Sequence, residues 1–259
     1  THFDFMGTNK KSLIIVSAII VVCIGSFAIR GLSQSIDFTG GRNFKVQFEN
    51  PVEPEQVREL ISSKFGDANV SVIAIGTDKK TVRISTNYRI EDEGNNVDSE
   101  IESYLYETLK PVLTQNITLE TFIDRDNHTG GSIVSSQKVG PSIADDIKTG
   151  AIYSVVLALL AIGLYILLRF RNIAYSIGSI VALSCDTIMI IGAYSLFWGI
   201  LPFSLEIDQT FIGAILTAIG YSINDKVVIF DRVREFFGLY PKRDKRQLFN
   251  DSLNTTLAR

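Results

Sequence analysis

Three consecutive polar residues, Asn224, Asp225 and Lys226, follow the apolar first half of the stretch AILTAIGYSINDKVVIFDRVRE, which runs from residue 214 to residue 235. That first half is apolar enough for a membrane helix, where a charged side chain costs roughly 2.5–3.5 kcal/mol on insertion scales. If the helix starts near Asp208, Asp225 lies about 25 Å along it, in the inner half of a bilayer. Lys226 has a long stem that can reach the interface, but Asp225 does not. Asp225 is therefore the first candidate functional residue.

Small and polar residues recur on the same helix, a pattern that favours close packing against other helices. They are spaced by four, three and four positions: Gly213, Thr217, Gly220 and Asn224. Burial favours a neutral carboxylic acid and a nearby cation favours the carboxylate, so a conformational change can make Asp225 take up and release a proton. Lys226 either pairs with Asp225 or reaches the cytoplasmic surface and leaves it alone. A buried carboxylate with a purely structural role is the alternative to a proton carrier.

A second carboxylate, Asp186, lies near the middle of another apolar stretch, NIAYSIGSIVALSCDTIMIIGAYSLFW. Gly178, Ala182 and Asp186 are four residues apart, so this carboxylate also lies on a face of small residues. Two roles are open for Asp186. It is part of a proton relay, or it makes a helix-packing hydrogen bond to a neighbouring Ser or Thr.

The sequence offers few residues for metal, redox or nucleotide chemistry. His2 and His128 are its two histidines, and they lie far apart. Cys23 and Cys185 both fall in apolar stretches, so a structural disulfide is not expected. Neither a GxxxxGK[ST] loop nor a GxGxxG turn is present. We expect no metal, no cofactor and no enzymatic bond chemistry, and the net charge of −3 argues against a nucleic-acid partner.

The candidate residues must be positioned by membrane helices. The chain has 259 residues, 46% of them hydrophobic, and a mean hydropathy of +0.21, which is high for a soluble protein. Its apolar residues gather in four blocks, each near or above the ~20 residues that cross ~30 Å of hydrocarbon. The predicted spans are residues 12–33, 149–170, 172–198 and 207–231. The first is interpreted as a retained anchor, because its apolar stretch is too long for a signal peptide and its flank is a poor cleavage site.

Basic residues mark the cytoplasmic ends of membrane spans. They lie before the first span, between the second and third and after the fourth: Lys10, Lys11, Arg169, Arg171, Arg232, Arg234, Lys242, Arg243, Lys245 and Arg246. The connection after the third span, GILPFSLEID, has no Lys or Arg. Segments 1–11 and 232–259 are therefore predicted to be cytoplasmic, and residues 34–148 to lie on the other side.

The segment 34–148 has the alternating patterns of a small α+β domain. Strands are predicted at residues 42–49, 69–77, 81–88 and 117–125, and amphipathic helices at residues 53–65 and 97–113. Further strand-like sequence at residues 132–140 leads back to the membrane. The order βαββαβ predicts a ferredoxin-like domain inserted between the first two spans.

Three strings resemble the SecF family of the bacterial Sec system, whether separate or fused to SecD. They are SIDFTGG directly after the first span, VGPSIADDIKTGAIYSVVLALLAIGLYILLRFR, and AIGYSINDKVVIFDRVRE. The similarity covers residues 11–259. It implies a proton-driven machine of the resistance–nodulation–division superfamily in the bacterial inner membrane, which works with SecD and draws preproteins from the SecYEG channel. It also implies a periplasmic location for residues 34–148 and six spans, of which the fifth and sixth follow this sequence.

The resemblance also assigns roles to individual residues. The essential membrane carboxylate of the family corresponds to Asp225, and its essential Arg, in a Thr-Leu-x-Arg string, corresponds to Arg259. Asp186 matches a family Asp that usually follows His, where this sequence has Cys185. Lys226 stands where a small hydroxyl residue is common.

Two other classes of function compete with protein export. A small-molecule exporter of the same superfamily predicts larger outer domains with apolar substrate pockets than the roughly hundred residues found between the first two spans. A non-transporting membrane scaffold predicts that neutralising Asp225 has no effect.

Overall fold

The computed structural model describes residues 3–66, 68, 70–76, 78–92, 96–114, 117–126, 131–201 and 205–257. The chain forms two compact units. The membrane unit comprises residues 1–33, 151–200 and 210–259, and the sheet unit comprises residues 34–150 and 201–209.

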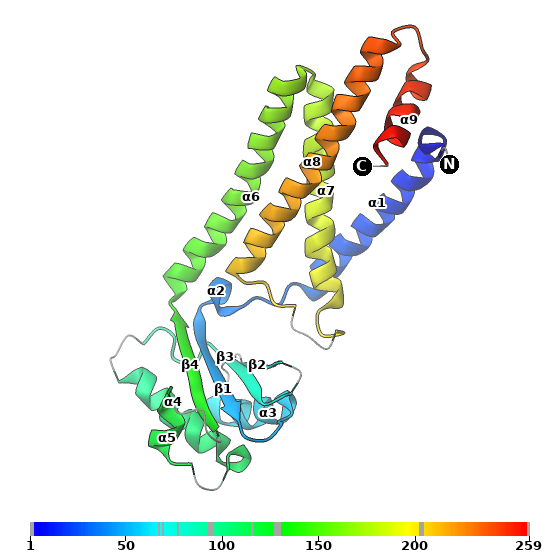
Figure 1. Cartoon of the computed structure of the whole chain (residues 1–259). Coiled ribbons are helices and arrows are strands. Elements are labelled where there is room, and N and C mark those ends of the chain that lie inside the picture. The colour runs from blue at the N-terminus through cyan, green and yellow to red at the C-terminus, as the bar shows by residue number, and fades with distance from the viewer. Residues whose placement is uncertain are drawn as a thin grey trace. The chain divides into compact units, whose positions relative to one another are not determined.

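Four of the described helices are long and apolar enough to cross a membrane (Figure 1). They are α1 (Phe5–Arg30), α6 (Pro141–Phe170), α7 (Ile173–Phe197) and α8 (Gln209–Leu239). A shorter helix, α9 (Lys245–Thr256), follows them. Four apolar helices with an inserted sheet domain are the architecture that the sequence predicts. Because α8 continues as a helix beyond residue 231, its last two turns lie outside the predicted span.

Local sequence signals fix the ends of these helices. Asp4 caps α1 by accepting a hydrogen bond from the Gly7 amide at 2.8 Å, and Gly31, with φ of +67°, ends that helix. Asn172 caps α7 by accepting from the Ala174 amide at 2.9 Å. The turn between α6 and α7 needs only two residues, so these helices are antiparallel neighbours.

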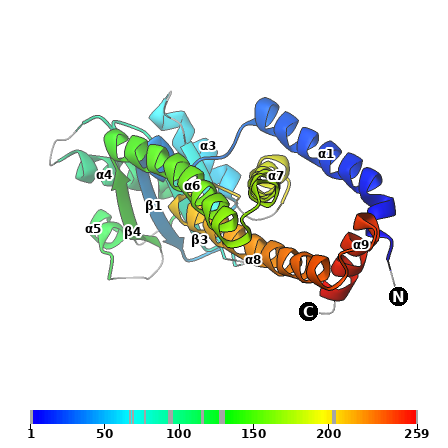
Figure 2. The same ribbon diagram turned by 90° about the horizontal axis from the view of Figure 1, so that it is seen from above.

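Helix α7 lies between α1 on one side and α6 and α8 on the other (Figure 2). A Cβ added to Gly192 would clash with the Cβ of Cys23, so α1 and α7 approach each other closely at this glycine. Next to this contact, the hydroxyl oxygens of Ser26 and Ser195 are 3.1 Å apart and buried. On its other side, the Ser176 hydroxyl donates to the Gly163 carbonyl of α6 at 2.6 Å. Small and hydroxyl residues thus hold α7 between its neighbours.

The sheet unit has the ferredoxin-like order of elements. Its strands pair antiparallel in the order β2-β3-β1-β4. The strands are β1 (Gly41–Phe48), β2 (Val70–Ile75), β3 (Thr81–Thr86) and β4 (Gly131–Val139). The helices are α2 (Ile36–Thr39), α3 (Pro54–Phe65), α4 (Val97–Leu109), η1 (Lys110–Val112) and α5 (Leu119–Ile123).

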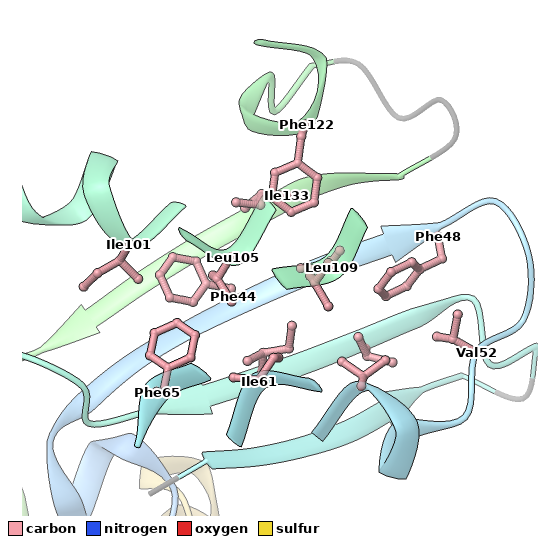
Figure 3. Packing of buried hydrophobic residues seen from close by; sticks show 14 of the residues in the cluster. Phe44, Phe48, Val52, Ile61, Phe65, Ile101, Leu105, Leu109, Phe122 and Ile133 are labelled. Atoms are coloured by element: carbon pink, nitrogen blue, oxygen red, sulfur yellow. The ribbon is translucent and has the colours of Figure 1, made fainter. Parts of the chain in front are cut away.

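The core of this unit lies between one face of the sheet and helices α3 and α4 (Figure 3). Alternate residues of β1 point into it, and residues four apart on each helix meet them, as the periodicities of strand and helix require. The contributing side chains are Phe44, Val46 and Phe48 of β1, Val57, Ile61 and Phe65 of α3, and Ile101, Leu105 and Leu109 of α4.

The predicted strand at residues 117–125 is wrong. That segment contains the short helix α5, capped by the Thr118 hydroxyl, which accepts from the Thr121 amide. Phe122 of α5 is fully buried in the core. The fourth strand is β4, the segment that the sequence had suggested only as a link to the membrane. β4 pairs antiparallel with the whole of β1, from Gly41 to Phe48, and so takes the edge position of the sheet that was predicted for residues 117–125.

Residues 205–208 of the α7–α8 connection belong to the sheet unit. The Ser35 amide donates to the Ile207 carbonyl at 2.9 Å, and Ile207 is buried. The Glu206 carboxylate, 8% exposed, forms an ion pair with Arg83 of β3 and accepts from the Ser71 hydroxyl at 3.2 Å. Burial raises the pKa of Glu206, and Asp208 adds to the rise, while Arg83 and Ser71 offset only part of it. Its ion pair therefore forms against a cost of desolvation.

Leu105→Ala should destabilise the sheet unit by about 2–5 kcal/mol, because the leucine side chain is fully buried in the core. The measurement is denaturant unfolding of residues 34–147 expressed alone, which we expect to unfold cooperatively. Glu107→Ala on the exposed face of α4 is the matched control and should leave the midpoint unchanged. A broad, non-cooperative transition in the unsubstituted domain would show that it does not fold alone.

Stability should depend on pH through Glu206. A carboxyl with a raised pKa binds its proton more tightly in the folded state, so unfolding free energy falls as pH rises above ~4.3, the ordinary value for Glu, through the raised pKa. We expect the wild type to lose thermal stability relative to Glu206→Gln over this window, measured on the whole chain in detergent. A gain relative to Glu206→Gln would mean that attraction by Arg83 outweighs burial.

Candidate functional site: charges within the membrane helices

Asp186 lies near the middle of α7. It follows the helix start at Ile173 by thirteen residues, which is about 20 Å along the axis. The hydroxyls of α7 that flank it bond to carbonyls of their own helix: Ser184 donates to Ile180 and Thr187 to Leu183. The Asp186 carboxylate takes its observed partners from another helix.

These partners are a pair of residues on α8. Lys226 donates to Oδ2 of Asp186 at 2.8 Å, and the Ser222 hydroxyl donates to the same oxygen. Ser222 and Lys226 are four residues apart, so they share one face of α8, and the Lys226 ammonium also donates to the Ser222 hydroxyl. The three side chains form a closed polar cluster between α7 and α8, with side-chain exposures of 33% for Asp186 and 20% for Lys226.

This cluster answers what the sequence left open about Lys226. Lys226 neither pairs with Asp225 nor reaches the surface, because its ammonium is bound to Asp186. A hydrogen bond from a serine to Asp186 is present, as the structural alternative predicted, but an ammonium joins it. Opposite charges that neutralise each other remove much of the cost of placing either one in hydrocarbon.

Asp225 lies on a different face of α8. Its side chain is exposed, as are those of its neighbours Tyr221 and Asn224. Among the residues that the structure describes, no side chain or amide forms a hydrogen bond or ion pair with the Asp225 carboxylate. The structure therefore separates the two carboxylates that the sequence singles out, one paired and one open.

The small-residue stripe of α8 is exposed together with Asp225. Nothing within the described chain lies within 4 Å of a Cβ added to Gly213 or Gly220, and the Thr217 hydroxyl bonds back to the Gly213 carbonyl. The buried side chains of α8 are those of Phe211, Ile215, Ile219 and Val233. The close packing predicted for the stripe is not made by any described helix of this chain.

Arg259 lies outside the described residues. The string that leads to it ends α9 beside the last turns of α8, where the Thr255 hydroxyl accepts from Nε of Arg232 at 3.2 Å. A hollow of about 150 Å³ opens there, lined by Val228, Asp231, Arg232, Glu235, Thr255 and Thr256. Nearby, Arg169 of α6 forms an ion pair with Asp231 of α8 at 2.7 Å.

No group of three His, Cys, Asp or Glu side chains suited to a metal ion occurs within the described ranges. His2 and His128 are outside those ranges. The site is thus built from carboxylates, an ammonium and a hydroxyl, which can exchange protons and form ion pairs.

Sequence reasoning missed the pairing of Lys226 with Asp186. The available signal was the four-residue spacing of Ser222 and Lys226, which puts a donor pair on one face of the helix. That spacing does not reveal which helix lies opposite, so the partner required the tertiary structure.

Two family models match the chain. "Protein export membrane protein SecD/SecF, C-terminal" matches residues 91–259, and "SecD/SecF GG Motif" matches residues 25–52. Among curated proteins, a protein translocase subunit SecF of Rhodothermus marinus is 36% identical over 258 residues, covering 100% of this chain and 76% of the relative. A SecF of Magnetococcus marinus is 30% identical, covering 98% of this chain and 74% of the relative.

Solved structures of SecDF are also similar to this chain. The crystal structure of SecDF from Thermus thermophilus, described as a translocon-associated membrane protein, aligns with a TM-score of 0.76 at 26% identity. The alignment covers 100% of this chain and 31% of that one, so the chain spans under a third of the SecDF polypeptide. SecDF in a super-membrane-facing form aligns with a TM-score of 0.59.

A double-mutant cycle should reveal coupling between Asp186 and Lys226. Asp186→Asn or Lys226→Met alone leaves one charge without its partner, whereas the double variant removes both, so the losses should be less than additive by about 0.5–3 kcal/mol. Thermal unfolding in detergent measures this. The matched control is Arg169→Met with Asp231→Asn, a more exposed pair, whose coupling should be smaller. Equal coupling in the two cycles would contradict a special role for the mid-helix pair.

Proposed function

This chain belongs to the SecF family of protein translocase subunits, and we propose that it uses the proton gradient to help move preproteins across the bacterial inner membrane. Family membership makes it an accessory component of Sec protein export and a multi-pass membrane protein. The proposed partners are SecD, the SecYEG channel, the translocating preprotein, protons and the lipid bilayer, with no nucleic acid and no bond chemistry.

The distribution of charge supports a cytoplasmic N-terminus and a periplasmic sheet unit. At one end of the membrane unit, the start of α1 is bound to α9, since the Phe5 amide donates to Asn250 at 2.7 Å. The basic residues of α9 and of the α6–α7 turn are at this end. Arg30, at the other end of α1, is the exception. Its guanidinium donates to the carbonyls of Leu196 and Trp198, so it caps α7 and is not a marker of the cytoplasm.

Asp225 is the proposed proton carrier. The observation that supports this role is that its side chain is exposed. An Asp within a membrane helix, without a partner in the described chain, is free to bind a proton and to meet a cation supplied by another helix. Asp186 is held by Lys226 and Ser222, so it is assigned to keeping α7 and α8 together and not to the moving proton.

Arg259 is the proposed cation that alternately approaches and leaves Asp225. An arginine keeps its proton, so it cannot carry one itself. When it approaches, it favours the charged carboxylate and expels the proton; when it withdraws, Asp225 can be protonated again.

The α7–α8 connection supplies a covalent path from this switch to the sheet unit. Glu206 and Ile207 are bound within the sheet unit, and α8 begins only two residues later, at Gln209. A displacement of α8 during the proton cycle must therefore pull on a segment that is anchored to β3. We propose that the sheet unit transmits this movement to the emerging preprotein.

Replacing Asp225 with Asn should reduce export to the level of cells that lack the protein, because an amide cannot carry the proton. Asp225→Glu, which keeps a carboxylate, is the matched control and should retain part of the activity. Both variants are made in protein that carries all six expected spans, with membrane levels checked, and secretion of a Sec-dependent reporter is measured. Normal secretion by Asp225→Asn would favour the scaffold function instead.

Arg259 should act through Asp225. In the same six-span protein, Arg259→Lys keeps the charge without the planar guanidinium and should be partly active, while Arg259→Met should abolish export. Because both residues serve one cycle, Asp225→Asn combined with Arg259→Met should be no worse than either alone. If the losses in the double variant add, the two residues act independently and the coupled switch is incorrect.

A further inference from the structure

The polar cluster between α7 and α8 has the composition of a cation site. Oδ2 of Asp186 and the Ser222 hydroxyl oxygen both face one point, and the Lys226 ammonium occupies it, 2.8 Å from the carboxylate oxygen. Carboxylate and hydroxyl oxygens are the ligands that hard metal cations prefer. An ammonium donates hydrogen bonds to such oxygens and Na⁺ is coordinated by them, and either cation neutralises the single charge of the carboxylate.

We propose that Asp186 and Ser222 form a monovalent-cation site that this chain fills with its own Lys226. Lys226 is then the specificity-determining residue, because it keeps a free Na⁺ ion out of the membrane helices. The ammonium is tethered to α8 one turn from Ser222, so it remains beside the site and competes with any dissolved cation. Leaving the site would take a charge through hydrocarbon without a partner, which further opposes exchange.

The position of Asp225 fits this division of roles. Asp225 is exposed on another face of α8, outside the cluster, so filling the Asp186 site does not occupy it. One carboxylate is permanently neutralised by a built-in cation, and the other stays open to exchange. The assignment of Asp225 as the exchanging carboxylate rests on the proposed function, whereas the cation site itself does not.

A purely structural ion pair makes a different prediction. If Lys226 served only to join two helices, its removal would weaken the protein equally in every salt. If it fills a cation site, its removal should leave a vacancy that Na⁺ can occupy, and the loss of stability should be partly restored by Na⁺ alone. The identity of the cation in the buffer is therefore the variable that separates the two cases.

The test compares four proteins purified in detergent: wild type, Lys226→Ser, Lys226→Arg, and Lys226→Ser combined with Asp186→Asn. Thermal unfolding midpoints are measured in NaCl and in choline chloride at equal ionic strength, and bound ²²Na⁺ is counted by equilibrium dialysis. Wild type and Lys226→Arg, which both carry a fixed cation, should have the same midpoint in both salts and retain no Na⁺. Lys226→Ser should have a higher midpoint in NaCl and bind about one Na⁺ per chain at saturation. The double variant should lose both effects, because it lacks the charged ligand.

Several outcomes would overturn the proposal. They are Na⁺ binding by the wild type, an absence of Na⁺ binding by Lys226→Ser, or equal binding by Lys226→Ser and the double variant. If Lys226→Ser does not fold, Lys226→Gln replaces it, since an uncharged side chain of similar length also vacates the site. If export by the wild type proved independent of the proton gradient, the proposed function would fail, while the binding measurements would still decide the cation site.

Discussion

A charged side chain within hydrocarbon needs a partner, and the interface of α7 and α8 is organised around this requirement. Asp186 and Lys226 lie in the middle parts of two long apolar helices, where water does not solvate them well. Their contact makes the position of each helix depend on the other, because sliding α8 along α7 would separate the charges. Ser222 restricts the geometry further, since it bonds to both charged groups. A polar cluster of this kind specifies one arrangement among the many that apolar side chains would tolerate.

Helix α7 can serve as the fixed element because its other side is also tightly held. Gly192 allows the backbone of α1 to come close at Cys23, and the pair Ser26 and Ser195 adds a buried hydrogen bond. Arg30 then binds the last carbonyls of α7, which would otherwise lack partners at the end of the helix. By contrast, the face of α8 that carries Asp225 has no neighbour among the described helices. Helix α7 is therefore held in place by α1, whereas the exposed face of α8 is available for contact with a further helix.

The sheet unit is a small domain that three connections join to the membrane helices. Its core lies between the sheet and helices α3 and α4 and contains no described residue of the membrane helices. The connections α1–β1, β4–α6 and α7–α8 all enter or leave through it. The last connection is held by more than its covalent bonds. Glu206 is bound to Arg83 despite the cost of burying its charge, and this ion pair fixes the connection to β3.

The sequence by itself determined the features that depend on local physics. Long apolar blocks predicted the four helices, because length and hydropathy decide whether a segment can cross hydrocarbon. Alternation in β1 and four-residue spacing in α3 and α4 predicted the ferredoxin-like order, because each pattern marks one buried face. The intramembrane positions of Asp186, Asp225 and Lys226 were also evident from the printed residues. The family resemblance assigned a role to Arg259, a residue that lies outside the described ranges.

Tertiary structure decided everything that depends on which faces meet. Residues 117–125 and β4 both have strand-like composition, and only pairing along the full length of β1 selects β4 for the sheet. The sequence predicted that the Lys226 ammonium either pairs with Asp225 or reaches the cytoplasmic surface. It pairs with Asp186 instead, because the neighbouring helix places that carboxylate at the same level. Asp225, one residue earlier in the chain, lies about 100° away around the same helix and has no partner among the described residues. Neighbouring residues in a helix point in different directions, so their partners are determined by how the helices pack and not by their order in the chain.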